Sequence, residues 1–216
     1  MTVVETDGRF PQILSIPRSL KQSSFCSFAV SAINSALNAI DPVTCIDNAV
    51  YYQNGCLLVN SHRISLEKIQ RIRVVGGGKA ACGMTHALWN ILGNRIETGI
   101  VATHDNSENR SWNNGTVRII KSSHPLPDES SLFAANQVLS FAADLTENDL
   151  LIVLISGGAS SLLALPAAGL SLKDKQCVTS ELLLSGADIK MLNIVRKHLS
   201  AIKGGIDNEK AFVSPF

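Results

Sequence analysis

Two short strand-like runs, each followed by a turn of small residues, stand out in the pattern of hydrophobic and polar positions. The clearer run, Leu150 to Ile155, has six mostly branched apolar residues with no polar residue between them. This pattern is typical of a strand that is covered on both faces of a parallel sheet. Ser156-Gly157-Gly158 then favours a tight turn, and we expect Ser160 and Ser161 to cap a short apolar helix that ends before Pro166.

The other run, Arg71 to Val75, leads directly into the turn Gly76-Gly77-Gly78-Lys79-Ala80-Ala81. Residues 82–92 are predicted to form a helix that Gly93 closes. Both runs therefore predict a strand, a glycine turn and a helix. Because ligands of open parallel sheets bind at the carboxyl ends of the strands, we expect the two glycine turns to lie side by side at such an edge.

Further elements follow from the same reasoning. Apolar residues at helical spacing predict a packed amphipathic helix over residues 25–40, which Asp41-Pro42 ends. Asn54-Gly55 is the strongest short-range hairpin signal and predicts a two-stranded flap. The remaining expected elements are strands at 99–104 and 116–121, a helix over 129–144 capped by Asp128, a helix that starts with a capping box at Ser171 and Asp174 and ends at Gly186, and a last helix capped by Asp188 and stopped by Gly204-Gly205.

The alternation of strands and helices predicts the fold class. Helices between successive strands imply parallel pairing through crossover connections. We therefore predict a doubly wound, mostly parallel, Rossmann-like α/β sheet with helices on both faces. Residues 1–24 are polar and interrupted by prolines, so they are expected to be an extended or disordered lead.

The amino-acid composition bears on three kinds of partner: nucleic acid, metal ions and membranes. The 216 residues are 45% hydrophobic and 17% charged, and a net charge of +1 gives no reason to expect nucleic acid. The five cysteines and five histidines show no zinc spacing, so no metal ligands are predicted. No apolar run is long enough for a membrane span and no secretory signal is found, so the expected compartment is the cytoplasm, with mitochondria as the alternative.

Lys79 is the first candidate for chemistry. A lysine directly after three glycines, between a strand and a helix, places a positive charge beside exposed backbone N–H groups, which suits a phosphate or a carboxylate. The loop is not a Walker A motif, because the spacing G-x-x-x-x-G-K-[ST] is absent.

Other kinds of site are weaker alternatives. Gly76, Gly78 and Ala81 satisfy the loose dinucleotide-binding fingerprint. Asp105 ends the next strand, where an acidic residue that binds the ribose could lie, so an NAD-linked oxidoreductase is an alternative. SGGASS lacks the nucleophile elbow of serine hydrolases. His124 is a candidate base, but its place beside a proline favours a turn residue held by hydrogen bonds.

Four motifs together carry a resemblance to a known family. They are GGGKAACGM at 76–84, HPLPD at 124–128, LISGGASSLL at 154–163 and LNIVRKHLSAIKGG at 192–205. In this order and at these separations they resemble the amino-terminal domain of the glycerate 2-kinase family, the kinases of the MOFRL type. The resemblance covers roughly residues 25–205 and implies that these residues form one α/β domain.

The resemblance implies ATP-dependent phosphorylation of D-glycerate on its 2-hydroxyl group, with Mg²⁺ as the metal and 2-phosphoglycerate as the product. Lys79 matches the family lysine of the first turn, which is thought to contact substrate or the transferred phosphoryl group. Gly157, Gly158 and Ser160 match the turn that would hold nucleotide phosphates. Asn193 and Arg196, which lie on the last predicted helix, match polar positions that would line the same site.

The end of the chain departs from the family pattern. After Gly205 the sequence turns to IDNEKAFVSPF, whereas family members continue into a second domain. Residues 206–216 are therefore interpreted as a divergent tail, and we expect a truncated or alternatively ended product with little or no kinase activity alone. The alternative is a non-catalytic fragment that still binds nucleotide or glycerate. A missing strand would leave an exposed sheet edge, so a homo-oligomer is also expected as an option.

Overall fold

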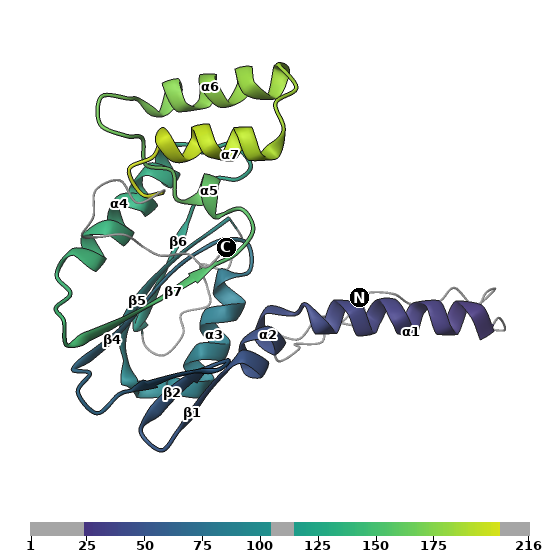
Figure 1. The fold of residues 1–216 in the computed structure, drawn as a ribbon, viewed down its shortest axis with the longest axis vertical. Coiled ribbons are helices and arrows are strands. Elements are labelled where there is room, and N and C mark those ends of the chain that lie inside the picture. The colour runs from purple at the N-terminus through teal and green to yellow at the C-terminus, as the bar shows by residue number, and fades with distance from the viewer. Residues whose placement is uncertain (1–23, 105–114, 204–216) are drawn as a thin grey trace. The chain divides into compact units, whose positions relative to one another are not determined.

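The computed structural model describes residues 24–104 and 115–203 (Figure 1). This part of the chain divides into two compact units. The first contains residues 24–67 together with His86–Gly93, and the second contains Lys68–Thr85 and the described residues from Asn94 onward. Most of the expected amino-terminal lead, the acidic candidate Asp105 and the Gly204-Gly205 stop lie outside the described residues.

The first unit begins with α1 (Ser24–Ala39), which agrees with the predicted helix. The expectation that this helix is packed is wrong, because its apolar side chains are exposed: Phe25 by 76%, Phe28 by 72% and Ile33 by 46%. Periodicity in a sequence specifies a helix and its apolar side. It does not specify the surface that would cover that side.

Asp41-Pro42 starts a second helix as well as ending the first. In α2 (Pro42–Ala49), the Asp41 carboxylate accepts a hydrogen bond of 2.9 Å from the N–H of Thr44, and Pro42 occupies the first turn. Three antiparallel strands follow: β1 (Val50–Gln53), β2 (Cys56–Val59) and β3 (His62–Ser65). The predicted hairpin at Asn54-Gly55 is confirmed, with φ of 51° and 74°, while β3 adds a strand that was not predicted.

The second unit is built on a parallel sheet of four strands in the order β6-β5-β4-β7. The strands are β4 (Arg71–Gly77), β5 (Ile96–Thr103), β6 (Val117–Lys121) and β7 (Asp149–Ile155). β5 and β6 extend the sheet on one side of β4, and β7 pairs with its other side. Strand order therefore reverses between β4 and β7, which is the topological switch point of a doubly wound sheet. The predicted α/β fold class is confirmed.

Two connections after β4 agree with the predicted pattern. α3 (Ala81–Leu92) follows β4, and a short 3₁₀ helix, η2 (Gly93–Arg95), leads into β5. Gly93 has φ of 54°, as a closing glycine requires. The helix belongs partly to each unit, because residues 81–85 are counted with the second unit and residues 86–92 with the first.

The core of the second unit lies between the sheet and α4 (Glu129–Ala143), whose predicted cap at Asp128 is confirmed. Buried strand residues meet buried residues of α4 and of the segment after β7; they are Val75, Ile100, Ala102, Ile120, Ala134, Ala135, Val138, Leu162 and Leu163. Val74 and Val101, on the opposite face, are fully buried too. β4 and β5 are therefore covered on both faces. The expectation that Leu150 to Ile155 is covered on both faces is wrong, because β7 lies at the edge of the described sheet and Val153 is 36% exposed.

The helix after the second glycine turn differs from the prediction at its cap. α5 (Ala159–Leu162) has Gly158 as its N-cap, with φ of 92° and no side-chain cap. Ser160 and Ser161 lie inside the helix, so the expectation that they cap it is wrong. A positive φ at the cap position favours glycine over serine. Ser161 Oγ instead donates to the carbonyl oxygen of Pro125 at 2.8 Å.

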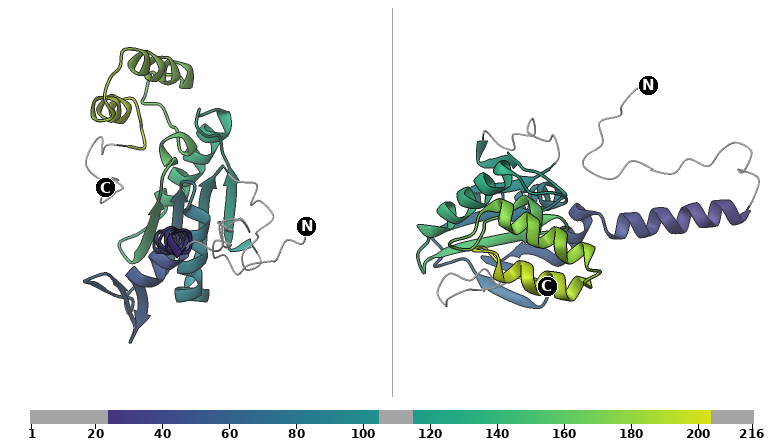
Figure 2. Two further views of the ribbon diagram at one scale, coloured as in Figure 1. Left: turned by 90° about the vertical axis from the view of Figure 1, so that its right-hand side faces the viewer. Right: turned by 90° about the horizontal axis from the view of Figure 1, so that it is seen from above.

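The last two helices lie side by side (Figure 2). α6 (Leu172–Leu184) begins with the predicted capping box of Ser171 and Asp174, and α7 (Ile189–His198) has the predicted cap at Asp188. α7 ends earlier than expected. Its last turn is followed by Ser200, which forms an antiparallel bridge with Pro166.

Within residues 24–104 and 115–203, none of the helices has the length and apolar character that a membrane crossing requires.

Candidate anion-binding site at the switch point

Parallel register brings the two glycine turns together. Gly77 lies opposite Ile155 in the β4–β7 pair, so the two strands end at the same level. Just beyond, the N–H of Ser156 donates to the carbonyl oxygen of Gly77 at 3.1 Å, and the N–H of Lys79 donates to the carbonyl oxygen of Gly157 at 2.9 Å. The expectation that the turns lie side by side at the carboxyl edge is confirmed.

Gly78 is the position where this contact is closest. Its φ is 137°, which side chains rarely tolerate, and a Cβ atom there would collide with the Ser156 hydroxyl group and lie 2.7 Å from the Ser156 carbonyl oxygen. Only glycine therefore allows the two turns to approach this closely.

The backbone N–H groups of the first turn are already used. Gly78 donates to the carbonyl oxygen of Ala102 at 3.2 Å, and Ala80 donates to Ser156 Oγ at 3.0 Å. The Lys79 N–H is taken by Gly157, as described above. The expectation that Lys79 stands beside exposed N–H groups of its own turn is thus wrong, because the second turn occupies that space.

The second turn keeps its donors free within the described part of the chain. There the N–H groups of Gly157, Gly158 and Ser160 have no hydrogen-bond acceptor. A Cβ atom on Gly157 would meet nothing within 4 Å, and the exposed side chain of Lys79 flanks the turn, with Cγ 3.5 Å from the place of a Cβ on Gly158. Backbone donors without an acceptor, beside a lysine, can bind an anion.

His124 lies on the same turn and was not expected there. A Cβ atom on Gly158 would lie 2.9 Å from His124 Cδ2, and the ring of His104 stacks edge-on at 5.7 Å between centroids. Burial, together with the positive charge of Lys79 and the nearby His104, lowers the pKa of His124. Its imidazole is therefore neutral near pH 7, which leaves a ring nitrogen able to accept a proton.

Lys203 contacts the second turn, and the charges of Lys175 and Arg196 lie near enough to act on Lys203. Lys203 Nζ donates to the carbonyl oxygen of Ser160 at 2.7 Å, and Lys175 Nζ donates to the carbonyl oxygen of Leu165 at 3.3 Å. Burial lowers the pKa of Lys175 to about 8, assisted by repulsion from Arg196. Burial also lowers the pKa of Lys203 to about 7, assisted by repulsion from Lys175 and Arg196. Sequence reasoning missed Lys175, since nothing in a polar helix marks one lysine as the buried one.

The predicted site residues therefore fall into separate groups. Lys79, Gly157, Gly158 and Ser160 meet around one turn. Arg196 is half-buried and lies near enough to Lys203 for their charges to repel. The side chain of Asn193 is exposed and has no hydrogen bond to any residue that the structure describes, so no such bond joins it to the rest of the group.

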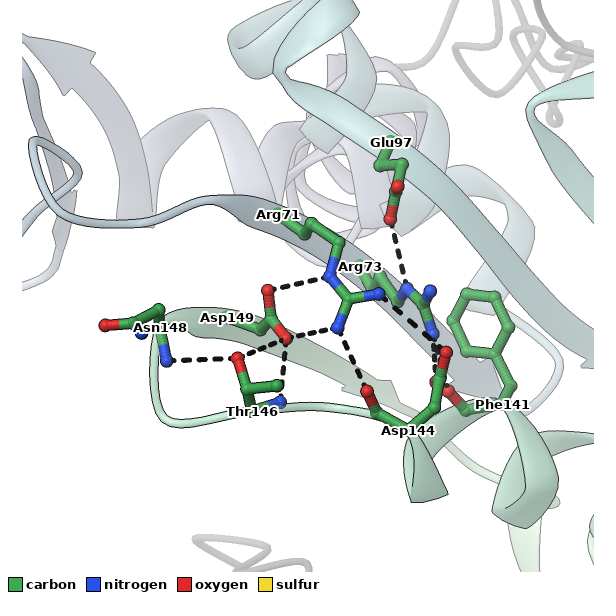
Figure 3. A network of polar contacts seen from close by, with 8 residues as sticks. All are labelled: Arg71, Arg73, Glu97, Phe141, Asp144, Thr146, Asn148 and Asp149. Atoms are coloured by element: carbon green, nitrogen blue, oxygen red, sulfur yellow. Dashed lines mark hydrogen bonds and ion pairs between the residues drawn. The ribbon is translucent and has the colours of Figure 1, made fainter.

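A separate network of hydrogen bonds and ion pairs lies at the opposite, amino-terminal edge of the sheet (Figure 3). Arg71 donates to both carboxylate oxygens of Asp149, at 2.9 Å and 2.6 Å. Arg73 contacts Asp144 and Glu97, and its guanidinium lies 4.9 Å from the ring centre of Phe141. These contacts tie α4 and the first residues of β4, β5 and β7 together, far along the strands from the glycine turns.

Comparison with known proteins shows which family of proteins this chain is similar to. The family model described as "Domain of unknown function (DUF4147)" matches residues 28–207. A glycerate 2-kinase from Pyrococcus horikoshii is 36% identical over 173 residues, which are 80% of this chain and 38% of that protein. A protein from Agrobacterium vitis named "Putative hydroxypyruvate reductase" is 46% identical over 135 residues, which are 62% of this chain and 34% of that protein.

A solved structure agrees with these matches. The crystal structure of glycerate kinase from Thermotoga maritima superposes with a TM-score of 0.67 and 34% identity, and the match covers 88% of this chain and 41% of that one. The chain thus spans between 34% and 41% of the length of these relatives. The four-stranded parallel sheet, its glycine turns and the family match agree, and the chain belongs to the glycerate 2-kinase family as its amino-terminal, DUF4147 domain.

Proposed function

We propose that this chain binds the phosphates of ATP at the second glycine turn and takes part in phosphoryl transfer to the 2-hydroxyl group of D-glycerate. The observation that carries the proposal is the set of backbone N–H groups at Gly157, Gly158 and Ser160, which have no acceptor among the described residues and lie beside Lys79. Such donors suit the oxygens of a phosphate chain. The glycerate kinases among the relatives support the reaction.

The described residues suit ATP better than a bound metal ion. Open space at Gly157 allows a phosphate to approach the backbone. In contrast, no group of three His, Cys, Asp or Glu side chains in residues 24–104 and 115–203 gathers as a metal site. Mg²⁺ prefers phosphate oxygens and water with few protein ligands, so it would arrive with the nucleotide. No step of the proposal assigns Mg²⁺ to a side chain of this part of the chain.

The proposed transfer needs positioning and charge neutralisation. The glycerate 2-oxygen would bond to the γ-phosphorus of ATP while the bond from that phosphorus to the ADP oxygen breaks. Lys79 would neutralise the charge on the transferred group. His124 lies beside Lys79 and would accept the hydroxyl proton, because its lowered pKa leaves the imidazole unprotonated near pH 7.

An anionic group of one of the two ligands, the substrate carboxylate or a phosphate of ATP, would be bound by the last helix. Arg196 is half-buried and has no ion pair in the described part of the chain, so it can pair with an anion. Asn193 would contribute only a weaker contact, since its side chain is exposed and separate. In this proposal D-glycerate is the small-molecule partner.

Two alternatives make different predictions. A non-catalytic chain would bind ATP or glycerate without turnover. The Agrobacterium relative is named as a reductase, which is a different class of enzyme from a kinase. An NAD-linked oxidoreductase would need backbone N–H groups at the first turn for the pyrophosphate. Those groups already donate to Ala102, Gly157 and Ser156, which argues against dinucleotide binding there.

A coupled assay with ATP, Mg²⁺ and D-glycerate, beside calorimetry with ATP and with NADH, separates these outcomes. We expect ATP binding that Lys79→Ala weakens and that Lys173→Ala, an exposed charge on α6, leaves unchanged. Turnover lost in Lys79→Ala would support transfer. ATP binding without turnover would support the non-catalytic alternative, and failure to bind ATP at all would reject the proposal.

A further inference from the structure

Lys175, Arg196 and Lys203 form a cluster of positive charge that the described part of the chain leaves without a counter-charge. They come from three places: α6, α7 and the segment that follows α7. None of them forms a salt bridge with a described carboxylate. The acidic residues of the same helices are used elsewhere or exposed: Asp174 pairs with Ser171, Asp188 caps α7, and Glu181 is exposed.

The cluster also has unused hydrogen-bond donors. An ammonium group carries three donors and a guanidinium five. The described residues give Lys175 one acceptor, the carbonyl oxygen of Leu165, and Lys203 one acceptor, the carbonyl oxygen of Ser160. They give Arg196 none. Lys175 is only 4% exposed, so water does not replace the missing partners as it would on an open surface.

Burying like charges together is unfavourable unless an anion joins them. A single carboxylate would neutralise only one of the three cations. A polyphosphate carries several charges along an extended chain and offers many acceptor oxygens, so it matches the cluster in charge and in hydrogen bonding. Ser160 connects the cluster to the second turn, since its carbonyl oxygen accepts a hydrogen bond from Lys203 while its N–H has no acceptor in the described part of the chain.

We propose that Lys175, Arg196 and Lys203 form a subsite for the polyphosphate chain of a nucleoside triphosphate. The inference rests on the proposed function, which puts phosphates at Gly157, Gly158 and Ser160. It extends the site to Lys175 and to Lys203, which lies within the motif at 192–205 but was given no ligand there. The subsite draws its charge from α6, α7 and the segment beyond α7, so part of the nucleotide site is formed outside the glycine turns.

The test is calorimetric titration of the 216-residue chain with inorganic tripolyphosphate, ATP and AMP, using Arg196→Gln and the control Lys190→Gln. Both variants remove one positive charge from α7, but Lys190 is exposed, and Arg196 has no described hydrogen bond whose loss would unfold the helix. We expect Arg196→Gln to weaken tripolyphosphate and ATP about tenfold, and Lys190→Gln less than about twofold. AMP should bind weakly and equally in all three proteins.

Each other outcome counts against a stated part of the proposal. If tripolyphosphate and ATP bind, Lys79→Gln weakens them and Arg196→Gln does not, the subsite is wrong while the proposed function survives. If neither ligand binds the unaltered chain, both fail. If ATP and AMP bind equally well and tripolyphosphate does not bind, the ligand is recognised by its nucleoside and the subsite is rejected.

A proton-linked signal provides a second readout. Burial and the charge of Arg196 lower the pKa of Lys175 to about 8, and burial with the charges of Lys175 and Arg196 lowers the pKa of Lys203 to about 7. An anion among them would raise both pKa values, so binding at pH 8 should take up protons. Titration in buffers of different ionisation enthalpy measures this uptake, and Lys203→Met should reduce it. Equal uptake in Lys203→Met would overturn the role of Lys203.

Discussion

Lys203 Nζ donates a hydrogen bond of 2.7 Å to the carbonyl oxygen of Ser160, which fixes a cation from beyond α7 against the second glycine turn. The pKa of Lys203 is lowered to about 7 mainly because the side chain is buried. Lys203 therefore joins the segment after α7 to the glycine turn at the sheet edge. Its burial there brings its own loss of a proton close to neutral pH.

Lys203 should make stability depend on pH. The folded chain holds Lys203 at a pKa of about 7, whereas the unfolded chain holds it near the ordinary lysine value. Between these two pKa values the unfolded state binds more protons, so the free energy of unfolding should rise as pH increases from 7 towards 10. Below pH 7 the cost of the buried charge is present in full.

Lys203→Met should remove most of this pH dependence and stabilise the chain by about 1–2 kcal/mol at pH 6, because an apolar side chain replaces a buried cation. Urea unfolding at pH 6 and pH 9 measures both effects. Lys190→Met, at an exposed position of α7, is the control and should change neither. A variant that is less stable than the parent at pH 6 would show that the bond to Ser160 outweighs the cost of burial.

Gly78→Ala should destabilise the second unit by about 2–5 kcal/mol. Gly78 has φ of 137°, and an added Cβ atom would collide with Ser156, so the backbone of one turn must move. Gly157→Ala is the matched control within the same site, since its Cβ would meet nothing within 4 Å. Thermal unfolding of both variants measures the difference, and equal stability would contradict the packing of the two turns.

Asp149→Asn should lower the thermal midpoint by several degrees at pH 7 and reduce the sensitivity of the chain to acid. Asp149 accepts hydrogen bonds from Arg71 and, with a smaller effect, from Thr146, and these bonds hold its pKa well below the usual range. The resulting stabilisation is complete above the ordinary aspartate pKa near 4 and is lost as pH falls below it. Urea midpoints at pH 7 and pH 3 measure this loss. Glu147→Gln, at an exposed position nearby, should leave both midpoints unchanged.

His124 should titrate below the ordinary histidine pKa. Burial contributes most to the lowered pKa, followed by the charge of Lys79 and by His104. Lys79→Gln should therefore raise the pKa of His124, whereas Lys173→Gln should not. Nuclear magnetic resonance of the histidine rings across pH 4 to 9 follows both changes. An unaltered His124 pKa in Lys79→Gln would show that the two side chains do not share one site in solution.

Much of the fold could be predicted from the sequence because the signals are local. The unbroken apolar run at Leu150 to Ile155 predicted a strand, although not its place at the edge of the sheet. Asp128, Ser171 and Asp188 predicted where three helices begin. Asn54-Gly55 predicted its hairpin in the same way. Each signal depends on a few adjacent residues, whose backbone preferences do not need the rest of the chain.

The candidate site was predicted only in part, for the opposite reason. The sequence determined that two glycine turns follow two strands and that Lys79 lies in one of them. Tertiary structure decided that Ala102, Ser156 and Gly157 accept the hydrogen bonds of the first turn, while the N–H groups of the second turn keep no acceptor among the residues that the structure describes. It also decided which lysine is buried, as Lys175 shows, and left α1 uncovered. Burial and hydrogen-bond partners depend on residues that are distant along the chain, so only the folded arrangement specifies them.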